Sequence, residues 1–195
     1  MKANLCEMGM EAMMSRRARA ERALIYGVSF FYMLLLMKIL FLSRISFDEL
    51  FDGHRAVDRA VNFLPLHSII AYLSGGTETL RRFSYANVVG NIAIFVPLGA
   101  YLPWLRQRGH VAANLLIVAF ASLLTEMIQW ALGIGTADID DLLLNCIGGL
   151  IGIVGYKLLL GVLRSEASAQ TAIAILSILG FPAVWCYLFM IKMKF

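Results

Sequence analysis

The stretch DIDDLLLNCIGGLIG, from Asp138 to Gly152, decides the fold of this chain. After its acidic start the stretch is apolar, and it contains Gly148 and Gly152 at the four-residue spacing that lets membrane helices pack closely. Its first half carries three carboxylates and the amide of Asn145 beside this apolar run. Polar groups at membrane depth persist where they face a partner or a water-filled cavity. The stretch therefore predicts a membrane-spanning helix whose first turns contribute to a functional site.

The composition of the whole chain agrees with a membrane protein. Of its 195 residues, 60% are hydrophobic and 15% are charged, and the mean hydropathy is +0.76. A soluble domain has about half apolar and about a quarter charged residues. The chain is long enough for a handful of membrane helices with short loops, and too short to add a separate soluble domain. We therefore expect an all-α, polytopic membrane helical bundle in one domain.

Apolar segments long enough to cross a bilayer recur along the chain. The five predicted spans are residues 23–42, 85–105, 111–133, 142–163 and 171–190. We expect the first to be a retained anchor, because no small-residue cleavage site follows it. Between the first and second spans, residues 59–73 alternate apolar and polar side chains around Pro65. This pattern predicts an interfacial or re-entrant segment.

Basic residues beside the spans indicate the orientation. Four arginines precede the first span: Arg16, Arg17, Arg19 and Arg22. Because cytoplasmic loops are rich in Lys and Arg, residues 1–22 are predicted to form a basic cytoplasmic N-terminus and residues 23–195 a single transmembrane domain. Five arginines after the first span oppose this assignment: Arg44, Arg55, Arg59, Arg81 and Arg82. With this topology, the polar ends of the second to fourth spans share the extracytoplasmic face.

The net charge of +4 and the cysteines point to no other partner class. The arginines cluster beside apolar segments, where they set membrane orientation, so nucleic acid is not expected as a partner. Cys6, Cys146 and Cys186 form neither a disulfide framework nor a metal-binding spacing and are interpreted as packing residues. The sequence leaves the oligomeric state open.

Polar side chains follow three of the spans at helical spacing. The three stripes are Asn87 and Asn91; Ser122, Glu126 and Gln129; and Asp138, Asp141 and Asn145. Residues three or four apart share one face of a helix, so the stripes are predicted to converge at one end of the bundle. The candidate ligand-binding residues are Arg59, Asn62, Asn87, Asn91, Glu126, Gln129, Asp138, Asp140, Asp141 and Asn145.

Each of these polar groups also has a structural interpretation. The amides can simply hydrogen-bond neighbouring helices, at a typical gain of roughly 0.6 kcal/mol each. A carboxylate costs roughly 2.5 to 3.5 kcal/mol at a helix centre on insertion scales, which favours function for Glu126. Asp138 suits a helix start, where acids cap the first turn. Three acids in four positions are less well explained in this way, because Asp140 is predicted to point away from the face of Asp138 and Asp141.

Four motifs resemble those of the VanZ-like family of membrane proteins in order and spacing. They are RAVNFLPL (Arg59–Leu66), NVVGNIAIFVPLG (Asn87–Gly99), EMIQ (Glu126–Gln129) and DIDDLLLNCIGGLIG. The resemblance covers residues 59–155 and implies a small multi-pass protein of the bacterial inner (cytoplasmic) membrane, in a family named for a member linked to glycopeptide antibiotic resistance. One departure is GIGTA, from Gly133, where the family often has an arginine before the acids.

The favoured function is that of a binding or accessory factor of the cell envelope. Its extracytoplasmic polar pocket would take a membrane lipid, a lipid-linked envelope precursor or an amphipathic antibiotic. Arg59 would lie near the headgroup, since guanidinium suits phosphate, and the glycine face around Gly152 would accept an acyl or prenyl chain.

The alternative is a metal-dependent intramembrane enzyme acting on a lipid phosphate or lipid-linked glycan. Glu126, Asp138 and Asp141 would hold Mg²⁺, which prefers oxygen ligands, and would be the catalytic candidates. No established metal or cofactor site follows from the sequence. Because no Ser, His or Cys is paired with a base in the sequence pattern, the binding role is preferred. Proton-coupled transport is a weaker third hypothesis, since no inverted repeat is visible.

Overall fold

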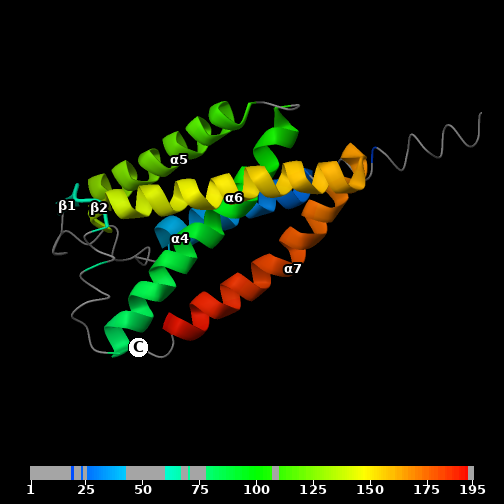
Figure 1. Ribbon diagram of the computed structural model, residues 1–195. Coiled ribbons are helices and arrows are strands. Elements are labelled where there is room, and N and C mark those ends of the chain that lie inside the picture. Colours follow the sequence, from blue (N-terminus) through cyan, green and yellow to red (C-terminus); the bar gives the residue numbers. More distant parts are fainter. Residues whose placement is uncertain are drawn as a thin grey trace, which may run out of the picture.

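The structure is a computed structural model that describes residues 19, 23, 26–42, 60–66, 70, 78–106 and 110–192. This part of the chain is almost entirely helical (Figure 1). It comprises a first helix, Tyr26–Phe41, which ends in the π-helical turn η1 (Lys38–Leu42), and then α4 (Glu78–Leu105), α5 (Val111–Leu132), α6 (Ile139–Leu163) and α7 (Glu166–Lys192). Two short strands, β1 (Val61–Asn62) and β2 (Ala137–Asp138), complete it. The predicted all-α class is confirmed.

Among the described residues, three helices are long and apolar enough to cross a membrane: Tyr85–Leu105, Val111–Leu132 and Ile139–Leu163. The other two predicted spans correspond to shorter apolar helices, Tyr26–Phe41 and Glu166–Gly180. The predicted bundle of five apolar helices is therefore present, and three of the five have full membrane length.

The turn between α5 and α6 reverses the chain over a few residues. Gly133 ends α5 in the left-handed conformation, with φ 61°, and its N–H bonds the carbonyls of Gln129 and Trp130. Glycine adopts this conformation without the steric cost that a Cβ brings. Asp138 begins α6, since its side chain accepts a hydrogen bond from the N–H of Asp140 at 2.9 Å. The helix-cap interpretation of Asp138 is thus confirmed.

Helices α4 and α6 touch backbone to backbone. A Cβ at Gly148 would lie 2.1 Å from the carbonyl oxygen of Ile92, and one at Gly152 would lie 2.0 Å from that of Val96. The close packing predicted from the GxxxG spacing is confirmed. The expectation that the glycine face around Gly152 accepts an acyl or prenyl chain is wrong, because α4 occupies it. Among the α6 glycines, a Cβ would meet open space at Gly155 and Gly161, further along the helix.

Tyr32 forms a hydrogen bond between the first helix and α4. Its hydroxyl donates a hydrogen bond to the carbonyl of Ile94. Ile94 lies three residues before Pro97, whose ring nitrogen carries no hydrogen and so cannot donate within α4. Tyr32 is 5% exposed and belongs to the hydrophobic core.

Replacing Tyr32 by Phe is expected to lower the stability of the folded protein by about 1 kcal/mol, because the buried hydrogen bond from its hydroxyl to the Ile94 carbonyl is lost. The free energy of unfolding would be measured in detergent by denaturant titration. The matched control is Tyr26→Phe, since Tyr26 is 56% exposed and packs its ring on Trp104. Equal stability of the two variants would contradict the bridging role of Tyr32.

Strands β1 and β2 form a parallel pair in which Val61 lies opposite Ala137 and Asn62 lies opposite Asp138. The pair ties residues 60–66 to the start of α6. The predicted interfacial or re-entrant segment is described only at residues 60–66 and 70. Arg59, most of the basic N-terminus and the rest of that segment lie outside the described residues.

Candidate functional site

Helices α5 and α6 run antiparallel in a register that two contacts fix. Asn145 Nδ2 donates to Ser122 Oγ at 2.8 Å. One turn away, a Cβ at Gly149 would meet the side chain of Val118 at 2.5 Å. In antiparallel helices, a step of one turn forward on one corresponds to one turn back on the other.

The same register places Glu126 across from Asp141. It also places Gln129 at the level of Asp138. This is the end of α5 and the beginning of α6, where β1 and β2 lie (Figure 1).

Asp141 is the point where α4 joins the site. Its Oδ1 accepts hydrogen bonds from Asn91 Nδ2 and, at 3.2 Å, from Asn87 Nδ2. Asp141 is 7% exposed and Asn91 is 8% exposed, whereas Asn87 lies at the surface. The predicted convergence of the α4 and α6 stripes is therefore observed, with two amides stabilising one carboxylate.

Asp138 joins α5 and β1 to the same end of the bundle. Its backbone N–H donates to Glu126 Oε2 at 3.2 Å, and its Oδ1 accepts from Asn62 Nδ2 at 3.2 Å. Asn62 Oδ1 in turn accepts from the N–H of Leu64 at 3.2 Å, as in an Asx turn. Glu126 is 6% exposed, so its carboxylate is a buried part of this network.

Asp140, predicted to point away from the face of its two neighbours, is 2% exposed. Its Oδ1 accepts a hydrogen bond from the N–H of Leu66, which has a positive φ of 62°. Asp140 therefore holds the turn that follows β1. A backbone donor of this kind has no signature in a side-chain pattern, so this role could not be predicted from the spacing of the acids.

We name these residues the acid–amide cluster: Asn62, Asn87, Asn91, Glu126, Asp138, Asp140 and Asp141. Two further candidates, Gln129 and Asn145, lie on the same helices, and each is 1% exposed. Gln129 Nε2 donates to the carbonyl of Leu40 at 2.8 Å, so it contacts the first helix. Of the predicted site residues, only Arg59 lies outside the described part of the chain.

Two buried acceptors at this end have no hydrogen-bond partner among the residues that the structure describes. They are Gln129 Oε1 and Asn145 Oδ1. A buried polar group left unpaired costs about 1 to 3 kcal/mol, and the cost is higher in a hydrocarbon surrounding. Within the described part of the chain, these two oxygens are therefore the acceptors at this end that a further hydrogen-bond donor would stabilise.

The carboxylates do not form a metal site within the described ranges, where no three His, Cys, Asp or Glu side chains group as metal ligands would. Mg²⁺ requires near-octahedral oxygen ligands. Asp138 and Asp141 instead accept hydrogen bonds from amides and backbone N–H groups. The donor set of the described residues does not fit the Mg²⁺ alternative.

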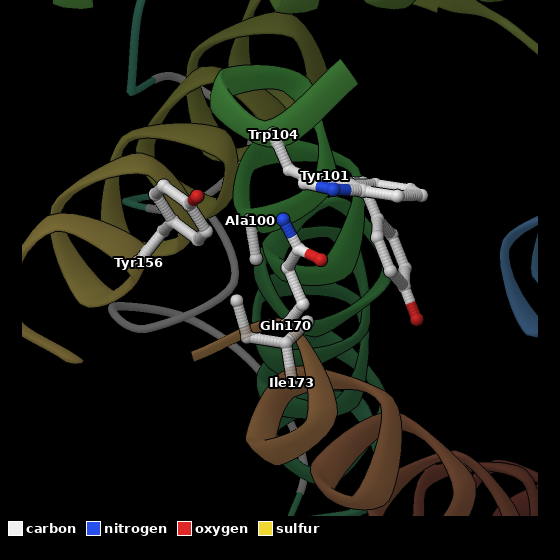
Figure 2. A pocket seen from close by; sticks show the side chains of 6 residues that line it. All are labelled: Ala100, Tyr101, Trp104, Tyr156, Gln170 and Ile173. Carbon is white, nitrogen blue, oxygen red and sulfur yellow. The ribbon is translucent and has the colours of Figure 1, made fainter. Parts of the chain in front are cut away.

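A separate small pocket lies between α4, α6 and α7, away from the acid–amide cluster (Figure 2). Its lining residues are Ala100, Tyr101, Trp104, Tyr156, Gln170 and Ile173. The amide of Gln170 points toward Tyr101 and Trp104 in this view. Three of its six lining residues are aromatic, and none is a carboxylate of the cluster.

Fold and site together define a multi-pass membrane protein with buried carboxylates at one end of its apolar helices. The chain belongs to the VanZ/LLP1 family, whose family model matches residues 29–160, from within the first helix to the last turn of α6. It is similar to protein VanZ of Enterococcus faecium, with 31% identity over 75 residues. The alignment covers 38% of this chain and 47% of that relative, about half of its length. No solved structure matches this chain.

Proposed function

We propose that this protein is a binding or accessory factor of the bacterial cell envelope. Its acid–amide cluster binds the polar part of a lipid-linked envelope precursor or of an amphipathic antibiotic at the extracytoplasmic side of the inner membrane. The five apolar helices all cross the bilayer in this proposal, and the arginines before the first helix keep the N-terminus cytoplasmic.

The observation that carries the proposal is the burial of Glu126 and Asp141 at the ends of membrane-length helices. Carboxylates at such positions are expensive and mark functional sites by default. The side-chain carbonyls of Gln129 and Asn145, which no described residue pairs, would also accept hydrogen bonds from a ligand. Hydroxyl and amine groups of glycans and glycopeptides supply such donors.

The surface of the helices supports a location in lipid. Large apolar side chains such as Phe30, Phe120 and Leu158 are each at least 65% exposed. Exposed apolar area on this scale marks a membrane-facing or partner-facing surface. A lipid-anchored ligand would reach the cluster laterally along such helices.

Family membership supports an envelope role, since the similar protein VanZ is bacterial. The resemblance noted in the sequence links the family name to glycopeptide resistance. The alignment covers about half of that relative. A role of this chain in glycopeptide resistance is therefore part of the proposal.

The test is direct binding by the purified full chain in lipid nanodiscs. The probes are a lipid-linked peptidoglycan precursor and the glycopeptide teicoplanin, with nanodiscs of phosphatidylglycerol alone as the background. Saturable binding of at least one probe is expected. The matched control is Asn114→Ala, because Asn114 is fully buried on α5 and bonds Arg106 at 3.3 Å instead of the cluster. Binding of neither probe above background would refute the proposal.

A further inference from the structure

The carbonyl of Asn145 is a buried acceptor that lies between α5 and α6. Its Nδ2 is already used by Ser122, and the residue is 1% exposed, so its Oδ1 faces no solvent. No described residue donates to this oxygen. Buried acceptors in proteins are normally paired, so an N–H or O–H donor carried by a ligand would stabilise this oxygen.

Two carboxylates lie one helical turn beyond this oxygen. The α5/α6 register places Glu126 and Asp141 on the next turn, on the side toward β2. Glu126 Oε2 accepts from the backbone of Asp138, and Asp141 Oδ1 accepts from Asn91. A carboxylate has about four lone-pair positions, so a hydrogen bond from the protein does not by itself prevent Glu126 or Asp141 from accepting another from a ligand.

We propose that Asn145 Oδ1, Glu126 and Asp141 together bind a primary ammonium group carried by an amphiphile. This inference rests on the proposed binding function and names the chemical class of the ligand. An ammonium has three N–H donors and no acceptor. It therefore matches a site whose groups are all acceptors, and its charge complements the two carboxylates.

Other ligand groups satisfy the site less completely. A hydroxyl offers a single donor and no charge, so it leaves buried acceptors unpaired. A quaternary ammonium has the charge but no N–H, and it cannot pair with Asn145. A phosphate would be repelled by carboxylates unless a cation accompanied it.

The experiment uses the purified full chain in detergent and a series of eight-carbon amphiphiles. n-Octylammonium is expected to raise the melting temperature saturably, because it binds the folded state only. Octyltrimethylammonium carries the charge without an N–H donor, and octanol carries a donor without the charge. Neither is expected to give a saturable shift of the melting temperature. An equal shift with octyltrimethylammonium would overturn the inference, since the N–H donors would then be irrelevant.

Two variants connect the effect to these residues. Asn145→Leu and Glu126→Gln are each expected to weaken n-octylammonium binding by about tenfold or more. Asn114→Leu is the matched control, because Asn114 is an equally buried amide on α5 outside the site. If Asn145→Leu does not purify as a folded protein, Glu126→Gln decides, since it keeps the shape of the side chain. Unchanged affinity in a folded variant would overturn the inference.

The ammonium could be carried by a membrane lipid or by an antibiotic, and two further arms separate these sources. Phosphatidylethanolamine is compared with phosphatidylcholine in nanodiscs, and teicoplanin is compared with its N-acetylated form. Weaker binding of phosphatidylcholine than of phosphatidylethanolamine would identify a membrane lipid as the source of the ammonium. Loss of teicoplanin binding on N-acetylation would identify the antibiotic. If teicoplanin or the lipid-linked precursor binds while no amine dependence is found, this inference fails and the proposed function stands. If nothing binds, both fail.

Discussion

Gly152→Leu is expected to prevent α4 and α6 from packing and so to abolish the folded bundle. A Cβ at position 152 would lie 2.0 Å from Val96 O, 2.7 Å from Ala100 N and 3.0 Å from the Gly99 carbonyl carbon. All three are backbone atoms, which cannot rotate away as a side chain does. Overpacking of a core typically costs about 1 to 3 kcal/mol. Here the helices themselves must separate, so we expect the upper end of this range or more.

The measurement is the yield of monodisperse protein in detergent and its melting temperature. Gly155→Leu is the matched control, because it lies on the same helix and a Cβ there meets nothing within 4 Å. Gly152→Ala should fall between the two, since it adds the Cβ alone. A Gly152→Leu protein as stable as the Gly155→Leu protein would show that α4 and α6 do not touch at this glycine.

This contact shows how far the sequence predicts the fold. The spacing of Gly148 and Gly152 is sufficient to predict close helix packing, because the pattern lies within one helix. It cannot identify the partner. The structure identifies α4, where Gly99 also approaches α6, with a Cβ position 2.0 Å from the carbonyl oxygen of Gly149. Gly99 has no second small residue at the four-residue spacing in this contact, so the sequence pattern does not mark it as a packing position.

The polar site is predictable to a similar extent. Residues three or four apart on one helix can be grouped, and Asn87, Asn91 and Asp141 do meet. The partners that belong to the backbone cannot be predicted in this way. Gln129 donates to the carbonyl of Leu40, and no side-chain pattern marks a carbonyl as an acceptor.

The β1/β2 pair escapes prediction for a different reason. Each strand has two residues, too few for a period-two alternation to be recognised. The RAVNFLPL motif therefore predicts only an interfacial or re-entrant segment. The parallel pairing of Asn62 with Asp138 is a long-range contact that depends on where α5 and α6 place the turn between them.

Glu126→Gln and Asp141→Asn are each expected to weaken binding of the envelope ligand strongly while leaving the bundle folded. Removing one charge from a buried hydrogen-bonded charge pair costs about 2 kcal/mol or more, which is about 30-fold or more in affinity. The amide introduced at position 126 keeps an oxygen for the N–H of Asp138, and the amide introduced at position 141 keeps one for an amide of α4. Affinity for the lipid-linked precursor and for teicoplanin would be measured in nanodiscs, alongside the melting temperature.

The matched control for charge is Glu166→Gln, since Glu166 is an exposed acid in the first turn of α7. It changes the net charge of the protein by the same amount, so a general electrostatic effect would appear in all three variants. Unchanged affinity in both cluster variants would reduce the acid–amide cluster to a structural network that joins α4, α5 and α6. Because each replacement keeps the length of the side chain and one hydrogen-bonding oxygen, loss of affinity at constant melting temperature would instead assign the binding role to the two carboxylate charges.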